Sequence, residues 1–204
     1  MLAAFFAVEN RFVLTGGGAL IGYHLQHRRS DDLDLFAKPP VDVQEGIASL
    51  LAAAARIGAS VERLRTFPEF CRVLVRRGDS SAIVDLAVDR APDLEPPVVA
   101  ADGVRMHSLR EIGANKVCAL LGRAEVRDLV DLRAILARGA DLVDLLRAAE
   151  RKDGGVSAAT LAWLLDSMTI GDSAELPGGV TPAELDQFRR ELVTELRRRA
   201  FPPA

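Results

Sequence analysis

The spacing of hydrophobic residues divides the chain into two parts. In the first part, short apolar runs bounded by turn residues predict β-strands, and apolar residues at helical spacing predict helices between them. The strands are expected over residues 11–15, 33–37, 60–66, 71–76 and 82–88. The helices are expected over residues 1–8, 19–26 and 41–57. This mixture predicts an α/β region over residues 1–100.

The second part follows a connector marked by Pro92, Pro96 and Pro97. From there the apolar residues recur only at helical spacing. Helices are expected over residues 108–121, 128–138, 141–151, 157–168 and 181–199. The whole pattern predicts an α+β protein in which a mixed sheet with flanking helices (1–100) precedes a C-terminal helical bundle (101–204).

Composition restricts the function classes further. The formal net charge of −3 gives no global basic surface, so nucleic-acid contacts must come from local patches. Cys71 and Cys118 are too few for a zinc site or a disulfide framework, and small buried residues are expected there. Trp163 and the phenylalanines are too sparse for a base-stacking platform and are expected in the core. Without an apolar run of membrane-spanning length, we expect a cytoplasmic protein.

A glycine turn and an Asp-x-Asp motif carry the strongest chemical signal. Thr15-Gly16-Gly17-Gly18 closes the first strand, and Asp32-Leu33-Asp34 begins the second. Side chains alternate along a strand, so Arg28, Ser30, Asp32 and Asp34 share one face. Two carboxylates on one face repel each other unless a cation lies between them, and Mg²⁺ prefers oxygen ligands and phosphates. Backbone N–H groups of the glycine turn suit phosphate, so the pattern predicts a metal-dependent nucleotide site.

A third carboxylate, Asp85, lies inside the apolar run 82–88. A buried carboxylate needs a partner or a metal, so Asp85 is expected to complete a Mg²⁺ site, with Mn²⁺ as a substitute, or to act as general base. The alternative is that Asp32 and Asp34 are solvated turn residues while Asp85 pairs with an arginine.

Lys116, Arg123 and Arg127 fall within one narrow arc if their segment is a single helix. Such cations suit a triphosphate or an RNA backbone, and the alternative is a solvated basic face. Asp128 is expected to cap the next helix, and Asp131 to pair with Arg127 across the turn.

Together these residues resemble the DNA polymerase β-like nucleotidyltransferase superfamily, in which a Gly-Gly or Gly-Ser pair, an Asp-x-Asp and a separate strand carboxylate follow in this order. The block from Ala114 to Leu132 resembles more closely the AbiEii/MenT-type toxins of that superfamily. The resemblance implies the polymerase β-like core fold, Mg²⁺ as cofactor and an NTP as substrate. It also implies that family members are toxins paired with antitoxin proteins. Some of these toxins transfer nucleotides to tRNA.

The resemblance assigns roles to individual residues. It implies metal binding and catalysis by Asp32, Asp34 and Asp85, with Lys116 as a further catalytic residue near the nucleotide. The expected nucleotide-binding residues are Gly17, Gly18, Arg28, Ser30, Lys116, Arg123 and Asp131.

The predicted function is transfer of NMP from an NTP to a hydroxyl acceptor, with RNA, and tRNA in particular, as the first choice. Two alternatives stay open at this point. One is a small-molecule hydroxyl acceptor, as in antibiotic-modifying relatives. The other is a nucleotide-binding regulatory module that acts through a partner protein without turnover.

Overall fold

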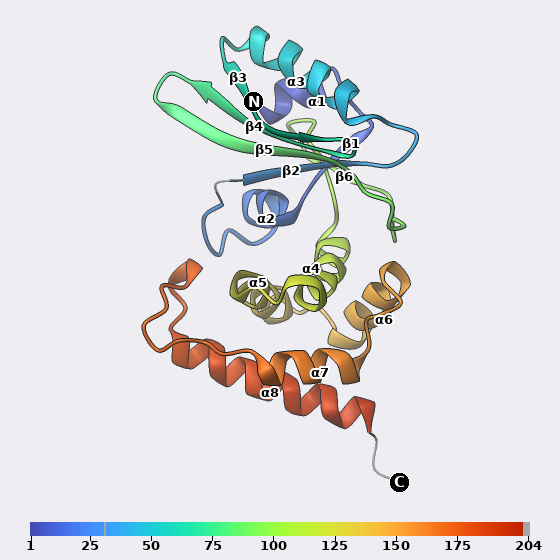
Figure 1. Cartoon of the computed structure of the whole chain (residues 1–204), viewed down its shortest axis with the longest axis vertical. Helices are drawn as coiled ribbons and strands as arrows, with labels where there is room; N and C mark the ends of the chain where they lie inside the picture. Colours follow the sequence, from blue (N-terminus) through green and yellow to red (C-terminus); the bar gives the residue numbers. More distant parts are fainter. Residues whose placement is uncertain (31, 202–204) are drawn as a thin grey trace. The chain divides into compact units, whose positions relative to one another are not determined.

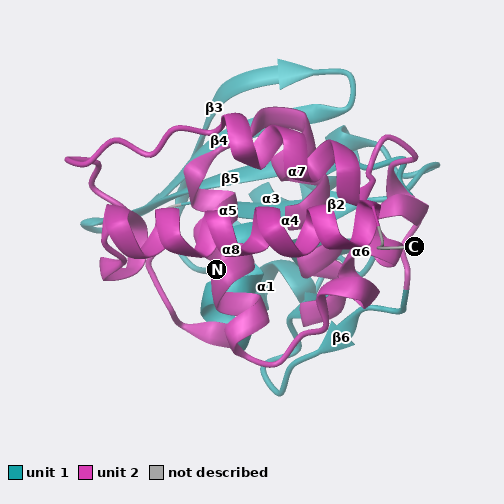
Figure 2. Ribbon diagram, turned by 90° about the horizontal axis from the view of Figure 1, so that it is seen from below, with its two compact units in different colours: residues 1–24, 30–91, 95–108 teal, residues 25–29, 92–94, 109–204 magenta. Residues whose placement is uncertain are grey.

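The computed structural model describes residues 1–30 and 32–201 of the chain. They form two compact units, shown in different colours in Figure 2. Unit 1 contains residues 1–24, 30–91 and 95–108, and unit 2 contains residues 25–29, 92–94 and 109–204. Compact units need not fold independently, so the division into domains at residue 100 stays a prediction.

Unit 1 is built on a mixed sheet, in which the described residues form seven strands in the order β3-β4-β5-β2-β1-β7-β6. The β2–β5 and β1–β7 pairs are parallel, and the other neighbours are antiparallel. The strands are β1 Phe12–Thr15, β2 Asp32–Ala37, β3 Ser60–Phe67, β4 Phe70–Arg77, β5 Ser80–Val88, β6 Val98–Val99 and β7 Arg105–Met106. The sequence predicts the first five of these strands but neither β6 nor β7.

The two faces of this sheet differ in character. One face, here called the covered face, is apolar, and helices α1 Leu2–Phe6 and α3 Val43–Arg56 lie on its side (Figure 1). Gly46 of α3 allows the close approach, because a Cβ there would lie 2.4 Å from the Phe12 ring. The opposite face carries Asp34 and Asp85 and is here called the acidic face. Helix α2 Gly16–Ala19 and the π-helix Leu20–Leu25 follow β1 on this side (Figure 1).

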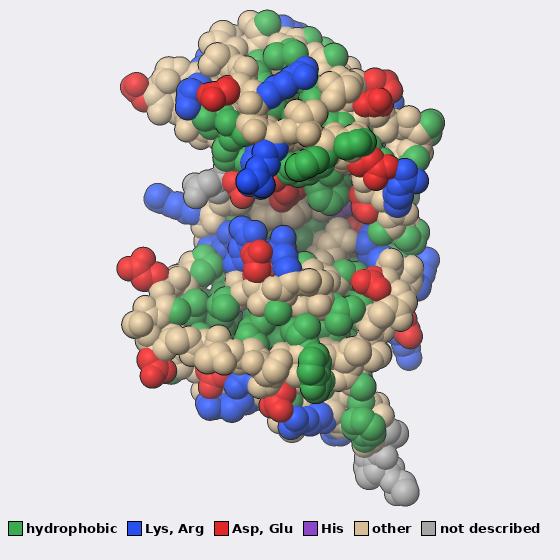
Figure 3. Space-filling model, viewed as in Figure 1, with side chains coloured by type: hydrophobic (Ala, Val, Ile, Leu, Met, Phe, Trp, Pro, Cys, Tyr) green, Lys and Arg blue, Asp and Glu red, His purple; other side chains and the backbone are tan. Residues whose placement is uncertain are grey.

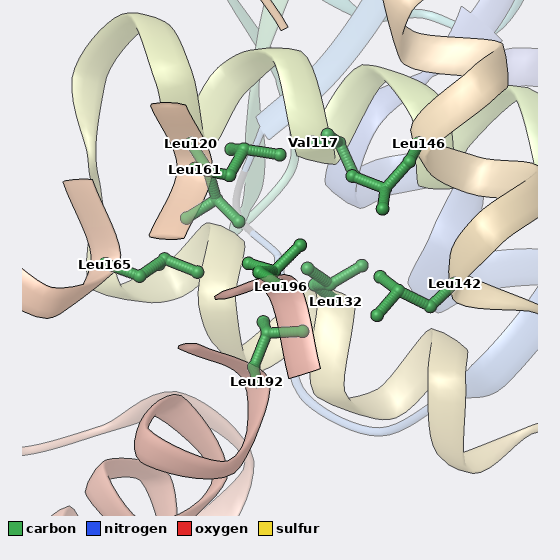
Figure 4. A pocket seen from close by; sticks show the side chains of 9 residues that line it. All are labelled: Val117, Leu120, Leu132, Leu142, Leu146, Leu161, Leu165, Leu192 and Leu196. Atoms are coloured by element: carbon green, nitrogen blue, oxygen red, sulfur yellow. The ribbon is translucent and has the colours of Figure 1, made fainter. Parts of the chain in front are cut away.

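Unit 2 is helical, as predicted. Its described elements are α4 Leu109–Arg123, α5 Val126–Ala137, α6 Leu142–Lys152, α7 Ala158–Ser167, the 3₁₀ turn Pro177–Gly179 and α8 Pro182–Ala200. Capping boxes at Ser157 and Thr181 begin α7 and α8. Apolar side chains from all five helices point toward one another at the centre (Figure 4): Val117, Leu120, Leu132, Leu142, Leu146, Leu161, Leu165, Leu192 and Leu196.

Some aromatic side chains contradict the expectation of core packing. Phe5 and Phe12 are fully buried, but Trp163 is 74% exposed and Phe67 is 57% exposed.

Both cysteines are free, and Cys71 is buried. Charges of both signs lie next to one another on the visible surface (Figure 3), and α8 shows this in Arg198 and Arg199, which both pair with Glu195. None of the helices in the described residues has the length and apolarity that crossing a membrane requires.

Candidate active site

Strand register brings the predicted carboxylates together on the acidic face. Asp34 of β2 and Asp85 of β5 are direct partners in the parallel pair. Asp32 precedes Asp34 by two residues, so its side chain lies on the same face. The row continues on both sides, because Asp85 lies opposite Arg72 of β4 and Asp34 lies opposite Thr15 of β1. Four adjacent strands thus contribute a continuous polar row.

Arg72 provides a cation within this row. Its Nε and Nη2 donate to the two carboxylate oxygens of Asp85 at 2.8 and 2.6 Å. These hydrogen bonds, with the charges of Asp85, Asp32 and Asp34, outweigh the effect of burial and raise the pKa of Arg72. The pairing of Asp85 with an arginine was one of the two sequence alternatives. The same alternative placed Asp32 and Asp34 in a turn, whereas both lie in strand β2.

The glycine turn contacts the backbone and side chains of β2. Gly16 has a φ of +59°, and a Cβ at this position would lie 2.1 Å from Oδ2 of Asp34. At Gly18 a Cβ would lie 3.3 Å from the backbone oxygen of Asp32. Gly17, which the sequence also singles out, is buried in α2. Sequence reasoning named Gly17 and Gly18 but missed Gly16, the residue packed against the carboxylate.

A histidine continues the polar row beyond Thr15. His107, which follows β7, lies with Nδ1 2.8 Å from Oγ1 of Thr15, and its backbone N–H donates to the Leu14 carbonyl at 2.9 Å. Nε2 of His24 lies 2.9 Å from the His107 carbonyl oxygen.

Ser30 is exposed, and its hydroxyl donates to the Asp32 carbonyl at 3.2 Å.

Unit 2 gathers the remaining predicted residues in a buried ionic cluster. Nζ of Lys116 in α4 lies 2.9 Å from a carboxylate oxygen of Asp128 and 2.6 Å from one of Asp131. Arg123 donates to both oxygens of Asp128 at 2.8 and 2.9 Å. The two aspartates are fully buried, and Lys116 is nearly so. The predicted cap role of Asp128 is wrong, because α5 begins at Val126 with Glu125 as N-cap.

Arg28 joins the cluster through Asp131. Its Nε and Nη2 donate to the Asp131 oxygens at 2.7 and 2.9 Å, and Nε2 of His27 lies 2.8 Å from one of them. Burial alone would raise the pKa of Asp131, but the hydrogen bonds from Arg28 and His27 and the charge of Lys116 hold it well below its usual value. The predicted pairing of Asp131 with Arg127 is wrong, since Arg127 pairs with Glu125 at 2.5 Å.

The acidic face has the donor chemistry that a hard divalent cation requires. Asp34 and Asp85 present carboxylate oxygens from directly paired positions, and Asp32 adds a third group on the same face. Carboxylate oxygens are ligands of Mg²⁺, which needs few protein ligands when phosphates supply the others. The guanidinium of Arg72 already binds both oxygens of Asp85, so a metal ion at this position would compete with it. These carboxylates are the donor type that Mg²⁺ prefers, but the closely spaced group of potential metal ligands among the described residues is a different one, formed by Asp93, His107 and Glu111.

Comparison with solved structures shows the same fold in two bacterial proteins. JHP933 from Helicobacter pylori has 21% sequence identity and a TM-score of 0.58, with 98% of this chain and 90% of that chain covered. MenT4, a nucleotidyltransferase toxin from Mycobacterium tuberculosis H37Rv, has 17% identity and a TM-score of 0.59, with 96% and 84% covered. Comparison with curated proteins gives no match.

The family comparison covers almost the whole chain. The family model described as "Nucleotidyl transferase AbiEii toxin, Type IV TA system" matches residues 1–203. Both parts of the sequence, the strands with the carboxylates and the helices with the ionic cluster, lie within this match. The chain therefore belongs to the AbiEii family of nucleotidyltransferase toxins.

Proposed function

We propose that this protein transfers a nucleoside monophosphate from an NTP to a hydroxyl group of RNA, with tRNA as the first acceptor to test. In this reaction the acceptor oxygen forms a bond to the α-phosphorus, and the bond from that phosphorus to the bridging oxygen breaks. Pyrophosphate leaves, and the acceptor proton passes to a base. The observation that carries the proposal is the in-register pair Asp34 and Asp85, with Asp32 on the same face.

Asp32, Asp34 and Asp85 would hold Mg²⁺, or Mn²⁺ in its place. The bound ion would neutralise charge on the triphosphate and orient it. In this proposal Asp85 also accepts the acceptor proton, although both of its oxygens accept hydrogen bonds from Arg72. Its action as a base therefore requires Arg72 to release at least one of these oxygens.

The ionic cluster of unit 2 is proposed to bind nucleotide phosphate. It combines the cations Lys116, Arg28 and Arg123 with the carboxylates Asp128 and Asp131. Cationic side chains gathered in one place suit an anion such as phosphate. Because Asp131 is fully buried, it acts in this proposal by orienting Arg28 and Lys116 rather than by touching the nucleotide.

The biological role follows from the family. Type IV toxin–antitoxin membership supports a cognate antitoxin protein. We place the activity in the cytoplasm, where NTPs and tRNA are found. Growth arrest on expression of the protein, relieved by co-expression of the neighbouring gene product, would support this role.

The test is incubation of the full chain with each labelled NTP and Mg²⁺, with total RNA and then without it. Label on RNA supports the proposal. Label on a small acceptor supports the antibiotic-modifying alternative, and nucleotide binding without pyrophosphate release supports the regulatory one. Asp34→Asn and Asp85→Asn should abolish transfer. Asp79→Asn, an exposed position in the β4–β5 turn, is the matched control and should retain it.

A further inference from the structure

The acidic face continues outward onto the β3–β4 hairpin. Arg65 of β3 lies directly opposite Arg72 of β4, and Phe67 lies opposite Phe70 at the end of the hairpin. Because cross-strand partners share a face, all four side chains lie on the same face as Asp85. We call these four residues the hairpin strip. It extends the polar row of the active site to the edge strand of the sheet.

The charge of the strip is unbalanced at its outer end. Two arginines directly opposite each other on neighbouring strands destabilise a sheet unless an anion compensates them. Asp85 compensates Arg72, but no ion pair of Arg65 is found among residues 1–30 and 32–201. Arg65 is exposed. The strip thus presents an exposed cation without an ion pair among these residues.

An aromatic surface accompanies this cation. Phe67 is 57% exposed, and its ring lies 6.4 Å from that of Phe70 at an angle of 35°. Phe67 and Arg65 are two residues apart on one face, which separates them by roughly 7 Å along the strand. A flat apolar ring next to a cation matches a ligand that carries an unpaired base next to a phosphate.

From these observations we infer that the hairpin strip binds a single-stranded end of the RNA acceptor, with a base stacked on Phe67 and a phosphate at Arg65. The inference rests on the proposed function and names the form of its acceptor. Three strand spacings separate Arg65 from Asp34 across the sheet, about 14 Å in total. This length suits a few nucleotides rather than a small hydroxyl compound. A duplex does not fit the site, because its paired bases are not free to stack on a side chain.

The other face of the same strand provides a matched control. Arg63 lies opposite Val73, so it belongs to the covered face, and like Arg65 it is exposed. Arg63→Gln and Arg65→Gln therefore make the same chemical change two positions apart on opposite faces.

Two variants of Phe67 test the aromatic ring. Phe67→Ala removes the ring, whereas Phe67→Leu keeps an apolar side chain and removes only the flat stacking surface.

The experiment measures binding of a fluorescein-labelled 12-nucleotide single-stranded RNA by anisotropy over a range of salt concentrations, with a duplex of the same sequence for comparison. Phe67→Ala and Phe67→Leu should weaken single-strand binding about fivefold or more, with an unchanged salt dependence. Arg65→Gln should reduce the slope of log K against log salt by about 0.7. Arg63→Gln should leave both quantities unchanged, and duplex binding should not respond to the Phe67 variants.

Transfer assays separate the inference from the function on which it rests. Phe67→Ala should raise KM for RNA and leave KM for the NTP unchanged. Equal effects of Arg63→Gln and Arg65→Gln, or wild-type RNA affinity in both Phe67 variants, would overturn the inference. If the wild type labels RNA while the variants behave like it, the inference fails and the proposed function stands. If the wild type labels no RNA, both fail.

Discussion

Replacing Gly16 with alanine tests whether the glycine turn positions the Asp34 carboxylate. Gly16 has a φ of +59°, and the new Cβ would lie 2.1 Å from Oδ2 of Asp34. Ordinary contact begins at 3.4 Å, so this oxygen must move by about 1.3 Å. A misplacement of about 1 Å in a reacting site costs about 100-fold in rate. We therefore expect kcat/KM for NMP transfer to fall about 100-fold in Gly16→Ala.

The stability of the same variant should change much less. A non-glycine residue in the left-handed region costs about 1–2 kcal/mol, and the Asp34 side chain can rotate away from the new methyl group. Gly58→Ala is the matched control, because Gly58 has a φ of +67° and open space around its Cβ position. Both variants should lose about 1–2 kcal/mol of unfolding free energy, but Gly58→Ala should keep the wild-type rate.

The assay combines urea denaturation with initial rates of NMP transfer at varied NTP concentrations. If Gly16→Ala and Gly58→Ala have the same kcat/KM, the reasoning about Asp34 is refuted. A Gly16 variant with wild-type activity would also show that Asp34 does not need the position that the glycine turn gives it.

Three further predictions concern the charged groups of each unit. Lys116→Met leaves two buried carboxylates without their shared cation and should lower the unfolding free energy by about 3–5 kcal/mol in urea denaturation; a loss below about 1 kcal/mol would contradict this. The pKa of Asp131 is lowered from 3.8 by folding, so its contribution to stability is complete above that pH and declines as the pH falls further. Thermal unfolding should show this decline, and Asp131→Asn should lack it. Arg72→Gln should tighten Mn²⁺ binding severalfold in a spin-resonance titration, since the guanidinium no longer competes for Asp85.

The main strands could be predicted from the sequence because each is a run long enough to show its periodicity. Strands β6 and β7 have two residues each, too few to show any period. Strand register could not be predicted. The pairing of Arg65 with Arg72 follows an irregularity between Arg63 and Arg65, and a shift by one residue would move each side chain to the other face. For this reason sequence reasoning missed Arg72.

The carboxylates were predictable for a local reason, and the cation arc was not. Asp32 and Asp34 share a face by alternation alone, and Asp85 interrupts an apolar run. The arc from Lys116 to Arg127 assumed one continuous helix, but α4 ends at Arg123 and Ala124 has a φ of +50°. Arg127 therefore belongs to a different helix from Lys116. Where that helix turns back, it brings Asp128 and Asp131, not a further cation, to Lys116.

Arg72 explains how this sheet can fold with three carboxylates on one face. Like charges on neighbouring strands oppose pairing, and Asp34 and Asp85 are direct partners. The guanidinium in the next strand compensates them through two hydrogen bonds to Asp85 and through the charges of Asp32 and Asp34. The acidic face therefore carries part of its own counter-charge, one guanidinium against three carboxylates. Across the same row Arg65 has no such partner among the described residues, so an external anion can pair with it at the edge strand, about 14 Å from Asp34.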